Sequence, residues 1–539
     1  MFKTYKSKIQ TRLSSLKDAL QTSKIMGSLS SSPTTAFKVK KIAVVGAGPS
    51  GLAVAKYLLA QDSAFSQIDV FEQASEVGGV WNYSADPSPI LELPVPQTNA
   101  HPQRPDSPLY RGKDGELNPL FPTPMYDDLN TNIPHTLMGY SDSSFPDSCE
   151  IYPRREDVQK YLVEYAKDVR HLIKFSTQVE NIYLRKNKEG RDQWEVITTD
   201  MLTKGETKDT YDAVVVASGH YSTPYIPDIK NIREFHANDP ESVLHSKLYR
   251  NADRYRDKKV VLVGTGASGL DIASQIQKVS KSPLLISAQT AVPPEVIEHI
   301  GNVKQIGEIK RFLPEERGIE YVPLAKSDGD DENQDDAKKE EQETVIETDI
   351  DVVLFCTGYL FTFPFLNSLS DLPLVTDGRR VHGLAKHFLH IKHPTLAFPG
   401  LPIKVIPFPL AESQGAVLAR LWSNSLPLPP LEEWGLEDGE GKSPEKYHVF
   451  PPGGDGRYIN ELHDLVVQQG GGEKKGKVPP HWDEEMLWER TIFAEAKMQF
   501  EKTGKKAKTL EELGFRFEAK SAPPVEELEK KEPRLDTAG

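Results

Sequence analysis

Two glycine-rich turns are the residues with the clearest chemical meaning in this chain of 539 residues. The first turn joins the apolar run 42–45 to the apolar-faced segment 52–59 and contains Gly46, Gly48 and Gly51. This G-x-G-x-x-G spacing between a strand and a helix is typical of a dinucleotide cradle, because glycine permits the tight turn and lets backbone approach a pyrophosphate. The free N–H groups at the helix start can bind the phosphates. The alternative is a glycine-rich turn in an ordinary α/β domain.

An acidic residue after the next apolar run favours the dinucleotide interpretation. Residues 68–71 form that run, and Glu72 follows it about twenty residues beyond the last glycine, where a carboxylate can accept both ribose hydroxyls of an adenosine. The stretch 41–72 is therefore predicted to bind a dinucleotide, through Gly46, Gly48, Pro49, Ser50, Gly51 and Glu72.

A second glycine turn repeats the pattern after the apolar run 260–263, and a helix is expected over 270–279. The next strand, 284–286, ends without an acid where Glu72 stands in the first unit. A carboxylate there would repel a 2′-phosphate, so its absence favours NADP over NAD, although the usual arginine clamp is also missing. Ser287, Gln289 and Thr290 could bind that phosphate instead. The residues expected to hold this second dinucleotide are Gly264, Gly266, Ala267, Ser268 and Gly269.

Composition narrows the class of protein. The formal net charge of −14 argues against nucleic acid as the main partner. The two cysteines, Cys149 and Cys356, form no C-x-x-C pair, so a disulfide scaffold, a zinc ribbon and a dithiol redox centre are not expected. No metal site is expected either. No apolar run is long enough to predict a transmembrane helix. A cytoplasmic protein is expected, while peripheral membrane association and mitochondrial targeting by the Ser/Thr/Lys-rich N-terminus stay open.

The elements around the two turns predict an α/β fold with two Rossmann-like dinucleotide-binding domains. Strands 211–219 and 350–358 bracket the second turn, so the economical arrangement inserts the second domain into the first. The predicted domains are a discontinuous first domain, 38–219 plus 349–515, and an inserted second domain, 220–348. Three segments are expected to be disordered because they are too polar to fold: an N-terminal extension, an acidic loop and a charged tail, at 1–37, 326–344 and 516–539.

Two helices outside the glycine turns have clear patterns. One begins near Pro153 and has apolar residues at the i, i+3, i+4, i+7 spacing of a single buried face, namely Val158, Tyr161, Leu162 and Tyr165. The other, 484–502, is the one helix expected in the Pro/Gly-punctuated stretch after residue 425.

Together, the motifs of the chain from about residue 39 to 515 resemble those of the flavin-containing monooxygenases, most closely the fungal branch. The main matches are Gly46-x-Gly48-x-x-Gly51, Gly78-Gly79-x-Trp81, Gly264-x-Gly266-x-x-Gly269 and Cys356-Thr357-Gly358-Tyr359. Smaller matches are Thr131-Asn132, Ser218-Gly219-His220-Tyr221 and the helix start at 152–158. The family's F-x-G-x-x-x-H-x-x-x-Y/F run is kept only from His245 to Tyr249, because Ala237 replaces its glycine and a short insertion follows.

The resemblance implies FAD on the first cradle and NADPH on the second, in an enzyme of the N,N-dimethylaniline monooxygenase type. NADPH would reduce the flavin, O₂ would add to give a C4a-hydroperoxyflavin, and a soft amine nitrogen or sulfur would take one oxygen atom. The implied partners are O₂ and a small amine or sulfur substrate, and a homodimer stays open. The alternatives are a Baeyer–Villiger enzyme, an N-hydroxylating enzyme and an NADPH flavoprotein reductase that does not oxygenate its substrate. Tyr249, where Baeyer–Villiger enzymes have tryptophan, disfavours the first of these.

The resemblance also implies individual site residues. Asn132 is the catalytic candidate: with bound NADP⁺, its amide would slow loss of the activated oxygen as H₂O₂, and the alternative is an Asx turn before Pro134. His220 and His245 are expected to be structural. Further cofactor contacts are implied for Gly79, Trp81, Thr131, Asn132, Ser218, Thr357, Gly358 and Gln414.

Overall fold

The computed structural model describes residues 36–519, except residue 62 and the stretches 86–92, 112–116, 325–342, 370–373, 435–442, 444–445 and 470–475. Nearly all of the predicted N-terminal extension and of the acidic loop, and most of the charged tail, lie outside the described residues. The expectation that these three segments are disordered therefore stays a prediction.

The first dinucleotide-binding domain is built on a seven-stranded sheet of order β20-β21-β22-β9-β1-β2-β5. Its parallel centre consists of β9 (Ala213–Val216), β1 (Lys41–Val45) and β2 (Gln67–Phe71). Every residue of β9 is buried, as expected for a parallel strand that is covered on both faces. The outer strands are β5 (Ile173–Lys174), β20 (Leu384–Ala385), β21 (Leu389–His390) and β22 (Leu396–Ala397).

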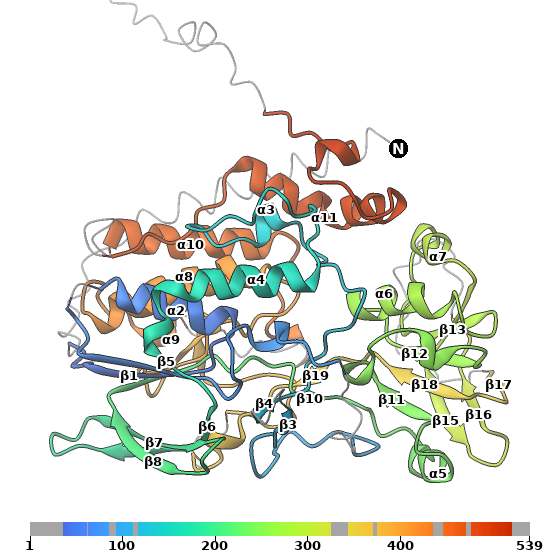
Figure 1. Ribbon diagram of the computed structural model, residues 1–539, viewed down its shortest axis with the longest axis horizontal. Coiled ribbons are helices and arrows are strands. Elements are labelled where there is room, and N and C mark those ends of the chain that lie inside the picture. Colours follow the sequence, from blue (N-terminus) through green and yellow to red (C-terminus); the bar gives the residue numbers. More distant parts are fainter. Residues whose placement is uncertain are drawn as a thin grey trace, which may run out of the picture. The chain divides into compact units, whose positions relative to one another are not determined.

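Helices cover one side of this sheet, and a β-meander covers the other (Figure 1). Helix α2 (Pro49–Leu59) packs on α8 (Pro407–Trp422), which in turn packs on α10 (Gly454–Gln469). Gly415 permits the close contact of the first two helices, because a Cβ there would lie 3.1 Å from the Cα of Val54. The meander consists of β6 (Thr177–Lys186), β7 (Asp192–Asp200) and β8 (Glu206–Tyr211).

The second dinucleotide-binding domain has a five-stranded parallel sheet of order β11-β18-β12-β13-β14. Alternate residues of β12 belong to two different apolar clusters: Val260 and Leu262 to one, Val261 to the other. The sheet is therefore buried on both faces, which explains its uninterrupted apolar strands. Its strands are β11 (Val243–His245), β18 (Val352–Phe355), β12 (Val260–Val263), β13 (Leu284–Ser287) and β14 (Val303–Ile306), and its helices are α5 (Ile232–Asn238), α6 (Ala267–Ile276) and α7 (Pro294–Ile300).

Strand β18 belongs to the second domain, although the chain was expected to return to the first domain at residue 349. It pairs with both β11 and β12, so it completes the second sheet and does not return to the first domain. The chain crosses back just afterwards, where β19 (Tyr359–Leu360) pairs antiparallel with β10 (Thr223–Pro224), the outgoing connection. The two connections thus form a small sheet of their own, and the second domain is an insertion with paired entry and exit strands.

Smaller elements complete the described structure. The apolar spacing predicted for α4 (Arg155–Tyr165) is confirmed, since its buried residues include Val158, Tyr161, Leu162 and Tyr165. Helix α11 has the predicted bounds, Glu484–Lys502. The remaining strands and α-helices are β3 (Leu109–Arg111), β4 (Asn118–Leu120), β15 (Ile309–Leu313), β16 (Gly318–Tyr321), β17 (Val345–Glu347), α3 (His135–Met138) and α9 (Leu431–Trp434).

Helix α10 was not predicted, and α11 is therefore not the single helix after residue 425. Glycines at its first and third positions, after two prolines, resemble a loop more than a helix start. In the fold these small residues serve packing: a Cβ at Gly456 would lie 2.8 Å from the Trp482 ring. Tertiary packing against Trp482 therefore outweighs the weak helix propensity of glycine.

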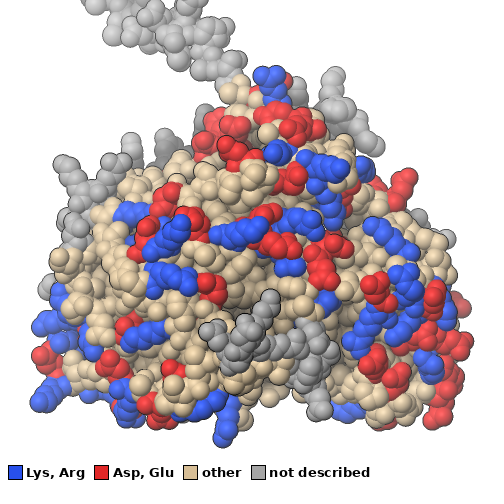
Figure 2. All heavy atoms as spheres, in the orientation of Figure 1, with Lys and Arg blue, Asp and Glu red and all other residues tan. Residues whose placement is uncertain are grey.

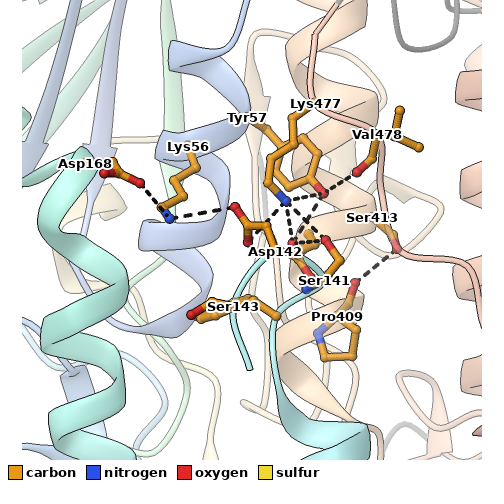
Figure 3. Close-up of polar contacts among 12 residues, drawn as sticks. Lys56, Tyr57, Ser141, Asp142, Ser143, Asp168, Pro409, Ser413, Lys477 and Val478 are labelled. Carbon is orange, nitrogen blue, oxygen red and sulfur yellow. Dashed lines mark hydrogen bonds and ion pairs between the residues drawn. The ribbon is translucent and has the colours of Figure 1, made fainter. Parts of the chain in front are cut away.

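A buried polar cluster ties α2, the loop after α3, α8 and the 477–478 segment together (Figure 3). At its centre is Glu412, whose side chain is fully buried. Its carboxylate accepts hydrogen bonds from the Ser141 backbone N–H and hydroxyl, each at 2.8 Å, from Lys477 at 2.9 Å and from Tyr57 at 3.3 Å. Burial raises the pKa of Glu412, and the Lys477 ammonium opposes that rise. The cluster satisfies a carboxylate that would otherwise be costly to bury.

On the face drawn in Figure 2, basic and acidic side chains are intermixed. Among the described residues, no helix combines the length and the apolar character needed to cross a membrane.

Candidate functional site

The first glycine turn is closed by contacts that only glycine allows. Gly46 has φ +101°, and a Cβ on it would lie 2.6 Å from the carbonyl oxygen of Ala217, at the end of β9. A Cβ on Gly51 would lie 1.9 Å from the carbonyl oxygen of Gly46, so helix α2 begins in direct contact with the turn. Pro49 occupies the first position of this helix, where its missing N–H costs nothing. The helix N-terminus is thus held at the carboxyl end of β1.

The paired glycines Gly78 and Gly79 lie against this turn. The Gly78 N–H donates to the Ala47 carbonyl at 3.0 Å, and a Cβ on Gly79 would lie 3.0 Å from the Cα of Gly48. Gly79 begins the short helix η2 (Gly79–Trp81), in which Trp81 is half-buried. The structure therefore brings two predicted cofactor-binding segments together into one backbone cradle.

Glu72 lies in this cradle and is buried. Its two carboxylate oxygens accept hydrogen bonds from the backbone N–H groups of Ala47, at 2.8 Å, and Ala74, at 2.9 Å. Burial raises the pKa of Glu72 above its ordinary value. The carboxylate thus braces the glycine turn, a role that the spacing did not predict.

The second glycine turn repeats the construction of the first. Gly264 has φ +106°, and a Cβ on it would lie 2.7 Å from the carbonyl oxygen of Cys356, at the end of β18. A Cβ on Gly269 would lie 2.2 Å from the carbonyl oxygen of Gly264. The first turn of α6 is more open than that of α2, since Gly266, Ala267 and Ser268 are exposed. Backbone N–H groups at an open helix start suit a phosphate.

The ends of β9 and β18 supply matching glycines beside the two turns. Gly219 and Gly358 have φ +71° and +80°, and a Cβ on either would meet no atom within 4 Å. Ser218, next to Gly219, is exposed, and the Thr357 hydroxyl donates to the Tyr225 carbonyl. The Gly358 carbonyl lies 3.0 Å from Nε2 of His245, so the structural role expected for His245 is what the geometry shows.

His220 marks an unsatisfied polar position at the end of β9. Neither ring nitrogen has a hydrogen-bond partner among the described residues, although both atoms are buried. Burial lowers the pKa of His220 to about 4, so the ring is neutral at ordinary pH. An orphaned buried polar group is uncommon in proteins and fits a site completed by a polar ligand. Gly219, with open space beside it, and the unpaired ring of His220 lie together at the end of β9 and are features that fit a bound dinucleotide.

The Thr131–Asn132 turn is held by its backbone, which leaves the Asn132 side chain exposed. The Thr131 N–H donates to the Pro153 carbonyl at 2.9 Å, and the Thr131 carbonyl accepts from the Lys497 ammonium at 2.9 Å. The alternative of an Asx turn is not supported, because Pro134 has no N–H and the next N–H, that of His135, donates to Ile151. The amide makes no hydrogen bond with another described residue and is available to a ligand.

Gln414 was expected to contact a cofactor directly, but its side chain contacts only protein groups among the described residues. Its side chain is fully buried in α8, where its carbonyl accepts from the Gly400 N–H at 2.8 Å and its amino group donates to the Tyr458 hydroxyl at 3.1 Å. A Cβ on Gly400 would lie 2.4 Å from the Ser50 hydroxyl. Gln414 therefore supports the glycine turn from behind, through Gly400 and Ser50.

Contacts that join the two domains were not predicted. The Tyr126 hydroxyl donates to the carboxylate of Asp271 on α6, and burial raises the pKa of both groups. The buried Arg250 side chain donates to the carbonyls of Ser84, at 2.7 Å, and Thr123, at 3.1 Å. These partners lie more than a hundred positions apart in the chain, so no local spacing could reveal them.

Two glycine cradles of the same construction, one in each of two α/β domains, define a dinucleotide-binding flavoprotein fold. Family models agree: residues 44–110 match an NAD(P)-binding Rossmann-like domain, and residues 121–301 match the flavin-binding monooxygenase-like family. The chain is 30% identical over 444 residues to the thiol-specific monooxygenase of Saccharomyces cerevisiae, an alignment covering 79% of this chain and 85% of that protein. The chain belongs to the flavin-containing monooxygenase family.

Other comparisons support the same assignment. The flavin-containing monooxygenase FMO GS-OX-like 4 of Arabidopsis thaliana is 30% identical, over 74% of this chain and 79% of that protein. Among solved structures, the S-allyl-L-cysteine S-oxygenase of Allium sativum has a TM-score of 0.63 at 24% identity, covering 89% of this chain and 98% of that chain. At that identity the likeness establishes the fold alone. The expected family, fold and flavin monooxygenase class are confirmed, with FAD and a nicotinamide dinucleotide as cofactors.

Proposed function

We propose that this enzyme uses NADPH and O₂ to transfer one oxygen atom to a soft sulfur or nitrogen nucleophile, giving an S- or N-oxide. The observation that carries the proposal is the duplicated cradle, in which Gly46 and Gly264 lie on the strand-end carbonyls of Ala217 and Cys356. Two such cradles suit an electron-donating dinucleotide and a flavin dinucleotide in one chain. Sulfur is the first substrate class to test, because one relative is a thiol-specific monooxygenase.

The choice of NADPH over NADH rests on the end of β13. No acid follows this strand, so nothing there repels a 2′-phosphate. Ser287 is buried and donates to the Gly307 carbonyl at 2.9 Å, so it is committed to the protein. Gln289 and Thr290 are exposed and remain the polar side chains that could hold the phosphate.

Bound FAD, reduced by NADPH, supplies the activation of O₂, and the protein supplies binding and position. The first cradle, where Gly48 and Gly79 lie close together, would hold the pyrophosphate of FAD, and the open start of α6 would hold that of NADPH. The Asn132 amide would hydrogen-bond at the reacting centre, and Lys497 fixes the turn that carries it through the Thr131 carbonyl. The first domain comprises residues 38–219 and 359–515, and the inserted domain comprises 220–358, with β18 in the latter.

The test is product analysis with the purified yellow protein. NADPH should bleach the flavin faster than NADH does, and air should restore the colour. A thioether, a tertiary amine and a ketone are then supplied separately. A sulfoxide or N-oxide formed in proportion to NADPH supports the proposal, whereas an ester from the ketone indicates a Baeyer–Villiger enzyme. NADPH oxidation without any oxygenated product would indicate a reductase and overturn the proposal.

A further inference from the structure

Two histidines and an aspartate meet at the surface of α10, far in sequence from either glycine cradle. They are His463 and Asp464 on α10 and His481, which lies just before α11. Each offers one ligand atom, and these atoms all lie within 4.8 Å of one another. The two imidazole rings have centroids 4.9 Å apart, and Nδ1 of His463 lies 3.3 Å from a carboxylate oxygen of Asp464. We propose that this group binds one divalent transition-metal ion, with zinc as the first candidate.

The two histidines are held opposite each other by an independent pair of hydrogen bonds. The Asn460 side chain donates to the Trp482 carbonyl at 2.8 Å and accepts from the Trp482 N–H at 2.7 Å. Asn460 is three residues before His463, so both lie on one face of α10. Trp482 directly follows His481 and is almost completely buried. The backbone that carries His481 is therefore fixed against the helix that carries His463, and this fixed geometry reduces the ordering cost of binding a metal.

The donor set selects the kind of metal. Two imidazoles and one carboxylate suit zinc and similar transition metals, whereas Mg²⁺ and Ca²⁺ prefer oxygen ligands alone. With metal–ligand bonds of about 2.1 Å, tetrahedral geometry needs ligand atoms roughly 3.4 Å apart, so small side-chain rotations would close the site. Three protein ligands leave one position for water. The Asp464 side chain is 57% exposed, which gives an ion access from solvent.

The ion would act as a clip between α10 and the segment that enters α11. Helix α10 supports α8 through the Tyr458–Gln414 hydrogen bond, and α11 carries Lys497, which holds the Thr131 carbonyl. The clip lies among elements behind the first cradle, so its expected effect is on stability and not on the oxygenation chemistry. The inference does not depend on which substrate the enzyme oxidises.

The experiment uses untagged, FAD-loaded, full-length protein that has been treated with EDTA and dialysed. Zinc chloride is titrated in by calorimetry, and thermal unfolding is followed with and without zinc. One ion per chain is expected, with a rise in Tm, since a ligand that binds only the folded state stabilises it. Magnesium chloride and calcium chloride should give no comparable rise in Tm.

Matched variants decide the site. His481→Ala should lower zinc affinity at least tenfold and abolish the Tm rise, while His171→Ala, an exposed histidine outside the group, should behave as wild type. In EDTA, the His481→Ala protein should unfold near the wild-type Tm, which shows that it folds. Zinc binding that is absent in wild type, unchanged in His481→Ala, or equally lost in His171→Ala would overturn the proposal.

Discussion

The ammonium nitrogen of Lys477 lies 2.9 Å from Oε1 of Glu412, and the glutamate is completely enclosed by protein. The pair joins the segment after residue 476 to α8, and through Tyr57 and Ser141 it reaches α2 and the loop after α3 (Figure 3). A buried carboxylate depends on its cation, because the loss of one partner leaves an uncompensated charge. The elements behind the first cradle are therefore joined through Lys477, whose ammonium also lies 3.4 Å from the Asp142 carboxylate.

Removing only the cation should be costly. Lys477→Met is expected to lower the free energy of unfolding by about 3–5 kcal/mol, because the Glu412 carboxylate would stay buried without its cation, with only the hydrogen bonds from Ser141 and Tyr57 left to it. Urea unfolding measures the change. The double variant Glu412→Leu/Lys477→Met is the control and should lose less than the single variant. A single-variant loss below about 1 kcal/mol would mean that solvent or another group neutralises Glu412.

The second cradle can be tested without disturbing the fold. Gly266 is exposed, and a Cβ on it would meet no atom within 4 Å, so Gly266→Asp should fold and retain FAD. The added carboxylate would repel a pyrophosphate at the start of α6, so KM for NADPH should rise at least tenfold. Gly205→Asp, at another exposed glycine, is the control. An unchanged KM in Gly266→Asp would remove NADPH from this turn.

The first cradle should be intolerant of any side chain. In Gly46→Ala the methyl group would lie 2.6 Å from the Ala217 carbonyl, and φ +101° is strained for alanine. The variant is expected to lose most of its bound FAD, which is measured as the ratio of flavin to protein absorbance. Gly504→Ala has a similar positive φ but open space around it, so it separates backbone strain from the loss of the cradle. Full FAD content in Gly46→Ala would contradict the placement of the flavin.

The role proposed for Asn132 predicts uncoupling. Asn132→Ala should raise the H₂O₂ released per NADPH oxidised severalfold while FAD content stays constant, because the exposed amide makes no contact that supports the fold. Asn302→Ala, another exposed asparagine, serves as the control. If the ratio in Asn132→Ala equals that of wild type, the amide does not act at the reacting centre.

Glu489 predicts a specific pH dependence of stability. The residue is 5% exposed, and its carboxylate accepts a hydrogen bond from Thr136. Burial, with Glu485, Glu511 and Asp483 nearby, raises the pKa of Glu489 to about 7. Because the folded-state pKa lies above the ordinary value of about 4.5, this group's contribution to stability is full below pH 4.5 and is lost as pH rises through 7.

Glu489→Gln cannot ionise and should remove this dependence. The variant should match wild type near pH 5 and exceed its free energy of unfolding by about 1–3 kcal/mol at pH 8. Urea unfolding at both pH values measures the difference. Glu495→Gln, an exposed position on the same helix, should change little at either pH. Equal stability of Glu489→Gln and wild type at pH 8 would show that Glu489 ionises without cost.

Local spacing along the chain was enough to predict the elements that carry the chemistry. The glycines of each turn are close in sequence to the strand and helix that they join, so their steric role can be read from a short window. The same holds for α4, whose buried face follows a helical period, and for α11, whose bounds are as predicted. Both cradles and the α/β class depend on such short-range patterns.

Contacts between distant segments were decided only by the tertiary structure. An apolar strand such as β18 carries no mark of the sheet that it joins, and it pairs with β11 and β12 because that completes a sheet buried on both faces. Gln414 has a side chain that could contact a cofactor, yet its amide is hydrogen-bonded to Gly400 and Tyr458 inside the protein. His463 and His481 form one group only because Asn460 fixes Trp482 against α10. A side chain's type sets which bonds it can make, and the folded chain decides which partners are within reach.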